Sequence, residues 1–349
     1  VWFVLIGMFA PAGKWFEYER DAGKYVTQPG MYFKEGGTMD RLRNYYSPDT
    51  LQRYVSGVDP LQTPWIIGPD AQTNVPFIFA EGQFYGKFVV EGVNYERVWI
   101  KMFDGDLVSL DWSFPSGGYR KGSPVLIALH GMNGNSELSM IKDQVKRAND
   151  RGWTAVAVTQ RGCDDTQIRN MLFNGEDAYK DLHVIAGVVR QCCENSIIIA
   201  SGISFGGVTV ANYPAIYGKE SRVDGCVSVA GSPDLSVCAK YRYSHRAYTP
   251  GVAHCKKIQS CYDRRKLDIL HRAGVDVEHV VSENCWDMVD WDTHVTCKLI
   301  NKKDVFDAAN AVSLAPSDLS DPRSQKPKNV TVPVLCVQVH SIHDLIQNF

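Results

Sequence analysis

The chain has 349 residues, 44% of them hydrophobic and 22% charged, with a formal net charge of -2. These values are ordinary for a globular protein and exclude a strongly basic surface, so we predict no nucleic-acid partner. The length is large for one domain, although a single α/β unit with an inserted cap reaches it. The ten cysteines include no Cys-x-x-Cys pair and no Cys/His spacing typical of zinc, so we predict neither metal nor cofactor.

An apolar segment opens the chain, from Trp2 to Phe9, and it is far shorter than the ~20 residues that span a bilayer. Three interpretations stay open: the end of a membrane helix, an interfacial segment, or an arm that packs on the core. Nearby Trp15, Phe16 and Tyr18 resemble an aromatic belt at a membrane interface. We therefore expect residues 1–90 to form an N-terminal extension that associates with a membrane, in a compartment that the sequence does not assign.

Strand-like runs follow at residues 84–90, 95–103 and 107–114. Asp104-Gly105 separates the last two runs, and Asp-Gly between two such runs is a strong hairpin signal. The sequence therefore predicts an antiparallel entry into a sheet.

From residue 124 the pattern alternates between strand and helix, which is typical of a mostly parallel sheet with helices on both faces. The predicted strands cover 124–129, 154–159, 196–200, 225–230 and 332–339, and predicted helices cover 138–148 and 176–190. Between residues 232 and 328 this alternation gives way to charged, aromatic and cysteine-rich helical sequence, which we interpret as a cap inserted over the site. Residues 91–349 are thus expected to form one α/β domain with a helical cap.

The cap sequence carries two further patterns. Basic residues interleaved with apolar ones predict the solvated face of an amphipathic helix: Lys256, Lys257, Arg264, Arg265 and Lys266. Five cysteines crowd the same region, and whether they pair depends on a redox compartment that stays open: Cys238, Cys255, Cys261, Cys285 and Cys297. Four others lie in or beside apolar stretches, where reduced cysteine behaves as a small buried hydrophobe: Cys192, Cys193, Cys226 and Cys336.

The stretch Gly202-Ile203-Ser204-Phe205-Gly206 has the Gly-x-Ser-x-Gly form of a nucleophile elbow. A β-branched run precedes it and a helical segment follows, which is the strand, turn and helix context that this motif requires. Gly202 and Gly206 fit, because a larger residue two positions either side of Ser204 would collide where strand and helix close on each other. Pro214 is expected to kink the helix or to end it one residue earlier.

A serine hydroxyl is a weak nucleophile, so it needs a base oriented by a carboxylate, together with donors for the oxyanion. We assign Ser204 as the nucleophile and the backbone N–H groups of Phe205 and Met132 as the oxyanion donors. Asp344 follows the last predicted strand, and we expect it to be the carboxylate because this motif runs in the order serine, acid, histidine.

The histidine of this triad is not identified. It should follow Asp344, yet the sequence ends at Phe349, and His343 is too close to Asp344 to donate a hydrogen bond to it and also reach the serine. Two alternatives stay open: the C-terminal end that carries the histidine is missing from this sequence, or the base has been lost. His130, in the oxyanion turn, is expected to be structural and to hold that loop through its ring nitrogens.

Several separated motifs occur in a recognisable order: Asp104-Gly105 with Leu110-Asp111-Trp112, His130-Gly131 with Gly134, Arg161-Gly162-Cys163, Asn174-Gly175 with Asp181-Leu182, Ser204-Phe205-Gly206-Gly207 with Asn212-Tyr213, and Val332-Pro333-Val334-Leu335 with Asp344. Together they resemble the α/β-hydrolase group that contains the embryogenesis-associated-protein-like hydrolases and their bacterial esterase and animal lipid-hydrolase relatives. The resemblance covers about residues 98–346 and implies the α/β-hydrolase fold and action on carboxylic esters, often lipid esters. Several members are held at membranes. In place of the family's Asp-Asp-Pro, this sequence has His343-Asp344-Leu345.

Two functions fit these observations. The first is a serine hydrolase that cleaves carboxylic esters of the lipid type through an acyl-enzyme, with a hydrophobic ester as substrate. The second is a catalytically inactive descendant of the fold that serves as a structural subunit of a larger, membrane-associated complex, since a fold by itself does not establish activity.

Overall fold

A computed structural model of the chain describes residues 90–337, apart from 104, 133, 164–165, 167–176, 233, 245–254, 256–258, 260–263 and 315–321. The extension expected for residues 1–90 lies outside the described residues except for Val90. Asp344 and the C-terminal loop lie outside them as well.

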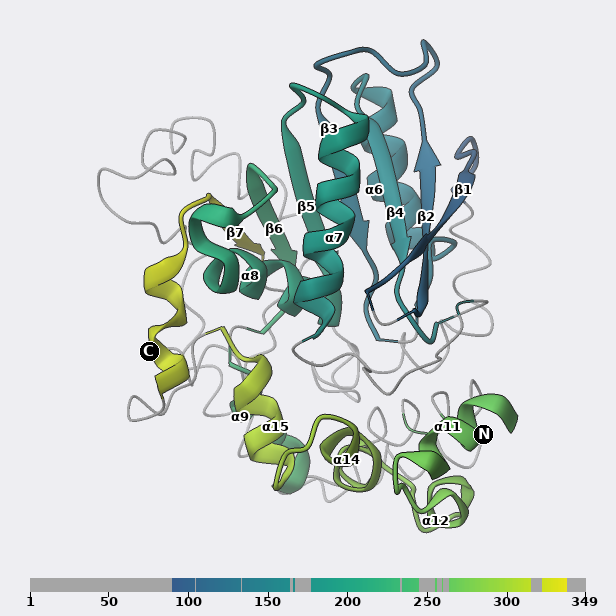
Figure 1. Ribbon diagram of the computed structural model, residues 1–349, viewed down its shortest axis with the longest axis vertical. Helices are drawn as coiled ribbons and strands as arrows, with labels where there is room; N and C mark the ends of the chain where they lie inside the picture. The colour runs from purple at the N-terminus through teal and green to yellow at the C-terminus, as the bar shows by residue number, and fades with distance from the viewer. Residues whose placement is uncertain are drawn as a thin grey trace, which may run out of the picture. The chain divides into compact units, whose positions relative to one another are not determined.

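Among the described residues, seven strands form one sheet in the order β1-β2-β4-β3-β5-β6-β7 (Figure 1). Their bounds are Glu96–Lys101, Leu107–Ser113, Val125–Leu129, Thr154–Thr159, Ile198–Ile203, Gly225–Val229 and Val334–Val337, from β1 to β7. β2 pairs antiparallel with β1 and with β4, and the remaining neighbours are parallel. The structure confirms a mostly parallel sheet with an antiparallel entry hairpin.

The entry hairpin turns at Gly105. Its φ is 94°, a value that glycine adopts at little steric cost. Met102 N–H donates to Asp106 O at 2.7 Å, and Gly105 N–H donates to Met102 O at 3.0 Å. Arg97 lies directly opposite Asp111 across the pair and forms a bidentate ion pair with it, at 2.7 and 2.9 Å. The register that the turn sets therefore also pairs these two charges.

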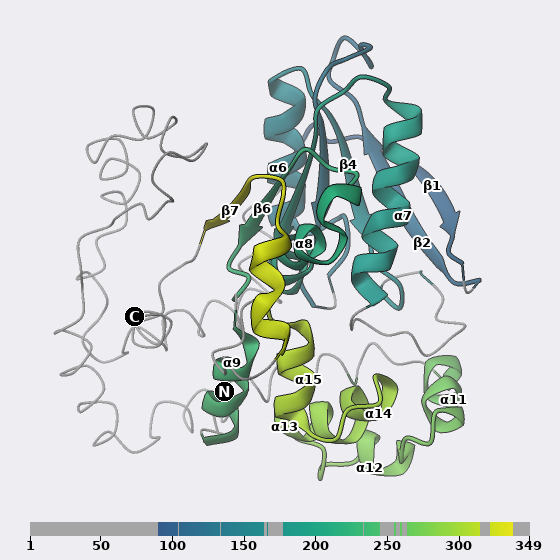
Figure 2. The same ribbon diagram turned by 60° about the vertical axis from the view of Figure 1, so that its left-hand side comes forward.

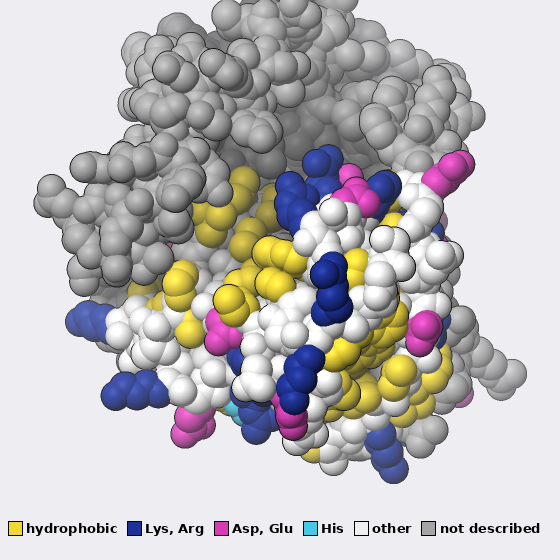
Figure 3. Space-filling view, turned by 90° about the horizontal axis from the view of Figure 1, so that it is seen from above, with side chains coloured by type: hydrophobic (Ala, Val, Ile, Leu, Met, Phe, Trp, Pro, Cys, Tyr) yellow, Lys and Arg dark blue, Asp and Glu magenta, His cyan; other side chains and the backbone are white. Residues whose placement is uncertain are grey.

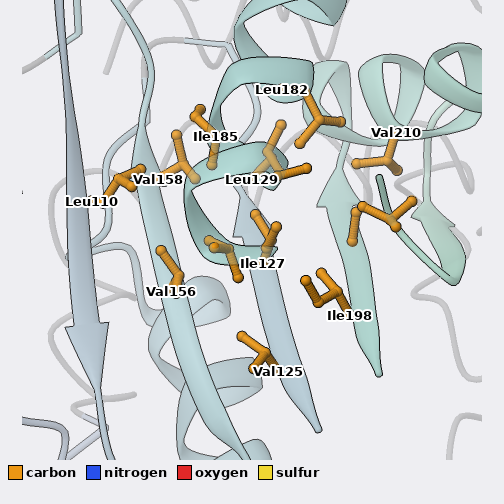
Figure 4. Packing of buried hydrophobic residues seen from close by; sticks show 14 of the residues in the cluster. Leu110, Val125, Ile127, Leu129, Val156, Val158, Leu182, Ile185, Ile198 and Val210 are labelled. Atoms are coloured by element: carbon orange, nitrogen blue, oxygen red, sulfur yellow. The ribbon is translucent and has the colours of Figure 1, made fainter. Parts of the chain in front are cut away.

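Helices cover both faces of the sheet, as predicted. They are α6 (Ser139–Asp150) on one face, and α7 (Asp177–Cys192) and α8 (Phe205–Tyr217) on the other (Figures 1 and 2). The alternation along β3 shows why: Ile127 packs toward α7 and α8, whereas Leu126 and Ala128 pack toward α6. Figure 4 shows the first of these layers, where strand residues meet Leu182 and Ile185 of α7 and Val210 of α8.

Of the two outcomes expected at Pro214, a kink or an end one residue earlier, the early end does not occur, because α8 continues to Tyr217. Proline removes one donor from the helix, which normally costs ~3 kcal/mol. All ten residues from 206 to 215 are buried. Packing of the whole helix against β5 and β6 outweighs the loss of one hydrogen bond.

The part of the chain between β6 and β7 is mainly helical, and its helices gather at the end of the sheet where the parallel strands terminate (Figures 1 and 2). Their bounds are Leu235–Ser244 (α9), Arg264–Arg272 (α11), Val277–Val281 (α12), Met288–Trp291 (α13), a π-helical turn at Asp292–Thr296, Cys297–Leu299 (α14), Val305–Val312 (α15) and a 3-10 segment at Pro322–Asn329. We refer to α9 through α15 as the cap. Aspartates accept from backbone N–H groups at the N-termini of three of these helices: Asp276, Asp287 and Asp304.

Three side chains in or near these elements differ from the sequence expectations. Lys266 is 6% exposed, so it does not lie on a solvated face of α11. Cys192 and Cys336 are exposed, whereas Cys193 and Cys226 are buried as expected. Local apolar composition marks a buried element, but it does not fix which side of that element faces water.

Figure 3 shows one face of the molecule, viewed from the end of the sheet away from the cap. On the part of this face that the structure describes, Lys and Arg side chains are interspersed with Asp and Glu around hydrophobic side chains. No helix within the described residues is long and apolar enough to cross a membrane.

A buried ion network joins three separate elements of the core. Arg161, at the turn after β4, donates to Asp181 of α7 at 2.7 and 2.6 Å and to Asp106, just before β2, at 3.0 Å. Arg161 is only 2% exposed, and both carboxylates are buried beside it. Such charges tolerate burial only while they are paired.

Arg161→Ala should lower the free energy of unfolding by ~3–5 kcal/mol, because it removes the Arg161 charge and its hydrogen bonds from two buried carboxylates. Arg147→Ala is the matched control, since Arg147 pairs with Asp143 on the exposed side of α6, where such a pair contributes ~0.5 kcal/mol. Urea denaturation followed by circular dichroism measures both variants. Similar losses in the two would contradict the role given to the network.

Candidate active site

Ser204 sits between the end of β5 and the start of α8, at the carboxyl edge of the parallel strands. Its backbone has φ 55° and ψ −120°, a conformation that costs a non-glycine residue ~1–3 kcal/mol. Two backbone bonds hold it there: Ser204 N–H donates to Val229 O at 2.8 Å, and Val208 N–H donates to Ser204 O at 3.0 Å. The residue is exposed, so the strained turn presents its hydroxyl to solvent.

The two predicted elbow glycines lie where backbones touch. A Cβ on Gly202 would overlap the carbonyl group of Gly206. A Cβ on Gly206 would lie 2.5 Å from His130 O and 2.6 Å from Leu129 O, well inside contact distance. The turn therefore requires glycine at both positions, and the second one also fits the helix start against the end of β3.

The loop after β3 packs directly on the serine. A Cβ on Gly131 would lie 3.0 Å from Ser204 Cβ and 3.4 Å from its Oγ. Met132, predicted to give an oxyanion donor, is the next residue along this loop. α8 begins at Phe205, and the first hydrogen bond of the helix is donated by the N–H of Val208. The N–H of Phe205 therefore has no carbonyl group within the helix to which it can donate.

His130 fastens this loop to the sheet and cannot serve as the base. Its Nε2 accepts from Gln160 N–H at 3.0 Å, so Nδ1 carries the proton and donates to Gly131 O at 2.5 Å. Gln160 Nε2 also donates to His130 O at 2.9 Å. Burial lowers the pKa of His130 to about 4, against a smaller opposing effect of the bond to Gly131. The ring is neutral with both nitrogens in use, as the structural interpretation predicted.

Three other described histidines contact groups other than Ser204. His183 Nδ1 and Tyr213 Oη share a hydrogen bond of 3.0 Å, and the His183 ring stacks on Tyr217. His279 and His294 pair in the cap, with ring centroids 4.0 Å apart. The structure thus brings together Gly202, Ser204, Phe205, Gly206 and Met132 of the predicted site, and it assigns no base within the described residues.

Polar contacts that the sequence did not reveal fix the cap to the helix of the elbow. Asn212 of α8 donates to Val312 O, at the end of α15, at 3.0 Å. Lys326 Nζ donates to Ala311 O and Ser313 O, each at 2.9 Å, and so binds the last carbonyls of α15. Leu235 N–H donates to Ser313 Oγ at 2.8 Å, which ties the first cap helix to the last. Asn212 is part of one of the motifs in the sequence, but its partner Val312 lies 100 residues away along the chain.

A second contact between cap and site is apolar. Met132 packs against a buried group of cap residues, which we call the cap cluster: Cys255, Leu270, Val275, Val280, Cys285, Met288, Trp291 and Val295. Burial of such side chains stabilises the cap by roughly 1.5–3 kcal/mol for each large one. Cys297 forms no disulfide, and Cys255 Sγ donates to Cys285 O at 3.5 Å. The described residues contain no group of three His, Cys, Asp or Glu side chains suited to a metal.

Comparison with known proteins agrees with this geometry. A protein family described as alpha/beta hydrolase fold matches residues 124–247, which include β3, the elbow and α8. Protein abhd-3.2 of Caenorhabditis elegans is 25% identical over 207 residues, 59% of this chain and 51% of its own. Embryogenesis-associated protein EMB8 of Picea glauca is 29% identical over 199 residues, 50% of this chain and 44% of its own. The chain has an alpha/beta hydrolase fold, and residues 124–247 resemble that family, with ABHD3-like and EMB8-like proteins among the similar sequences.

The chain spans about half the length of these relatives. Human phospholipase ABHD3 is 22% identical over 260 residues, 72% of this chain and 59% of its own. Among solved structures, an esterase of Pyrobaculum calidifontis matches with 20% identity over 56% of this chain and 67% of its own, at a TM-score of 0.38.

Gly202→Ala should destabilise the protein strongly, by several kcal/mol, because the new methyl group meets backbone that cannot move aside. Gly117→Ala is the control: a Cβ there meets nothing within 4 Å, so its effect should stay within ~1 kcal/mol. Chemical denaturation of the purified variants compares them. A Gly202 variant as stable as the Gly117 variant would show that the backbones do not approach as described.

His130 should also make stability depend on pH. Its folded pKa of about 4 lies below the ordinary value of 6.5, so the unfolded chain binds the proton more readily between these two values. The stabilisation is complete above pH 6.5 and is lost as pH falls toward 4, by roughly 3 kcal/mol in full. His130→Gln cannot titrate there, so the difference in unfolding free energy between wild type and variant should shrink on acidification. Urea titrations from pH 4 to 8 test this, and a pH-independent difference would contradict a buried neutral imidazole.

Proposed function

We propose that the chain is a serine hydrolase that cleaves carboxylic esters through an acyl-enzyme formed on Ser204. The observation that carries the proposal is the backbone of Ser204, strained at φ 55° yet exposed at the start of a helix. A protein has little reason to keep such strain at a solvent-facing serine unless the hydroxyl has a task. The position between β5 and α8 is the context in which Gly-x-Ser-x-Gly acts as a nucleophile.

In the proposed reaction Ser204 Oγ attacks the ester carbonyl and the alcohol leaves, which gives an acyl-serine that water then hydrolyses. The negative charge on the carbonyl oxygen falls between the N–H groups of Phe205 and Met132. Gly131 supports this arrangement, because its close packing on Ser204 puts the β3 loop beside the nucleophile. Each donor of this kind typically contributes a factor of ~10²–10³ in rate.

The remaining parts of the triad are proposals from the sequence. Asp344 is the proposed carboxylate, in the order serine, acid, histidine. The base is proposed to be a histidine other than His130, since His130 is neutral, buried and already bonded at both nitrogens.

A lipid-like ester is the proposed substrate class. The cap gives an apolar environment next to the site, because Met132 of the β3 loop already packs on the cap cluster. Relatives named phospholipase and putative esterase support this class. A site at a membrane surface fits such a substrate and is part of the proposal, together with membrane association of residues 1–90. The alternative of an inactive subunit in a membrane complex has no support from these relatives.

Ser204→Ala should reduce hydrolysis of a p-nitrophenyl ester by at least ~10³-fold, because no other hydroxyl replaces the nucleophile. The variant should remain folded by circular dichroism. Ser201→Ala, three residues earlier on β5 and buried, is the control and should keep most of the activity. Turnover that survives in the Ser204 variant would overturn the proposal, and absence of turnover in the wild type would favour the inactive alternative.

A further inference from the structure

Gly131 lies at the point where the loop after β3 touches the nucleophile. A Cβ at this position would lie 3.0 Å from Ser204 Cβ and 3.4 Å from its Oγ, so the contact leaves little room for a side chain. Glycine is also the residue whose backbone rotates most freely. The position that requires glycine is therefore the one whose backbone most needs other groups to hold it.

The peptide unit before Gly131 is held through its carbonyl group. A peptide unit is planar, so a hydrogen bond to the oxygen of His130 also orients the N–H of Gly131. Gln160 Nε2 donates to His130 O at 2.9 Å. Gln160 is 8% exposed, and Thr166 Oγ1 donates to its carbonyl oxygen at 2.9 Å, which holds the donor residue in the turn after β4.

The peptide unit after Gly131 is held in the same way. Its oxygen, Gly131 O, accepts from His130 Nδ1 at 2.5 Å and from Gly134 N–H at 3.3 Å. The second distance is long for a hydrogen bond, so the ring of His130 makes the stronger of the two contacts. The N–H of this planar unit belongs to Met132, the proposed oxyanion donor. The direction of that N–H therefore follows from the hydrogen bond that the ring makes.

The ring of His130 can donate to Gly131 O in only one of its neutral tautomers. The backbone N–H of Gln160 donates to Nε2 at 3.0 Å, which places the ring proton on Nδ1. The ring is 1% exposed, and in such a buried chain each hydrogen bond polarises the next one. The chain runs from the Gln160 N–H through the imidazole to the peptide unit that ends in the Met132 N–H.

We infer that His130 and Gln160 are positioning residues, which hold the two peptide planes on either side of Gly131. By holding them, they aim the Met132 N–H at the oxyanion that forms during attack by Ser204. This inference rests on the proposed function and deepens it. A hydrogen-bond donor accelerates the reaction most when it is aimed beforehand at the developing charge. Two polar side chains outside the triad thereby determine how well the transition state is stabilised.

Two substitutions at His130 separate the donor from the rest of the ring. His130→Asn places an amide N–H near the position of Nδ1 and so keeps a donor for Gly131 O, whereas His130→Gln places its amide near Nε2 and loses that donor. With p-nitrophenyl butyrate, His130→Gln should lower kcat ~10- to 100-fold and change KM less than ~3-fold, because the lost alignment acts in the transition state. His130→Asn should keep kcat within ~5-fold of wild type. Equal losses in the two variants would overturn the inference.

A change of one substrate atom distinguishes alignment of the donor from general damage to the fold. In the thiono analogue of p-nitrophenyl butyrate, sulfur replaces the carbonyl oxygen, and this weaker acceptor gains little from oxyanion donors. His130→Gln should therefore lower the ratio of kcat for the oxygen ester to kcat for the thiono ester ~10-fold. Val125→Ala opens a cavity at the first residue of β3, so it controls for lost stability and should leave the ratio unchanged. The same ratio in His130→Gln as in wild type would contradict a positioning role.

A variant of Gln160 acts on the other peptide plane and provides the test if His130→Gln does not fold. Gln160→Met keeps the length of the side chain and the backbone N–H, but it removes the donor to His130 O. It should lower the same ratio of rates ~3- to 10-fold. Losses in the double variant should combine less than additively, because both side chains hold Gly131. An unchanged ratio in folded Gln160→Met, or fully additive losses, would count against the inference.

The outcomes also separate this inference from the proposed function. Wild-type hydrolysis that does not depend on Ser204 would remove the proposed function, and the inference with it. Hydrolysis that depends on Ser204, with the ratio of the two esters unchanged in folded His130→Gln, would remove the inference alone. Circular dichroism and urea denaturation establish that each variant is folded.

Discussion

The close approach of two backbones at the end of β5 is the constraint on which the site depends. Gly202 and Gly206 leave no room for a side chain between the strand and α8, and Ser204 between them takes a positive φ as a result. The same approach presses the start of α8 against the carbonyl groups of Leu129 and His130. The same backbone contacts therefore determine both the position of Ser204 and the position of the β3 loop that packs on it.

Both polar and apolar contacts stabilise this geometry, in different parts of the molecule. The sheet holds the site through satisfied buried groups, such as the His130 ring bonded to Gln160 and the Arg161 network between β4 and α7. The cap is attached by the polar junction of Asn212 and Lys326 at the end of α15, and by the apolar contact of Met132. Buried polar networks give a fixed arrangement, whereas an apolar contact is not directional. This contrast suits the proposed role of Ser204 as a rigidly held nucleophile and the proposed role of the cap in binding an ester.

The sequence predicted what is encoded locally. β4 was predicted to the residue, because a β-branched apolar run marked it, and the elbow followed from the spacing of its glycines. Long-range pairing was not predictable: Arg161 meets Asp106 across 55 residues, and no local pattern identifies that partner. The early helix end that was one of two outcomes expected at Pro214 does not occur, and the prediction of a solvated Lys266 was wrong; in both cases tertiary burial overrode local preference. The carboxylate role of Asp344 stays a prediction.

The most direct test of the account is the site at which a fluorophosphonate attaches, determined by peptide mapping with mass spectrometry on the native protein. The account predicts one adduct, on the peptide that contains Ser204, because among the serines that the structure describes Ser204 is the one with a positive φ, next to the proposed oxyanion donors. An adduct on another serine, or no adduct on a folded chain, would contradict the claim that this turn makes Ser204 a nucleophile.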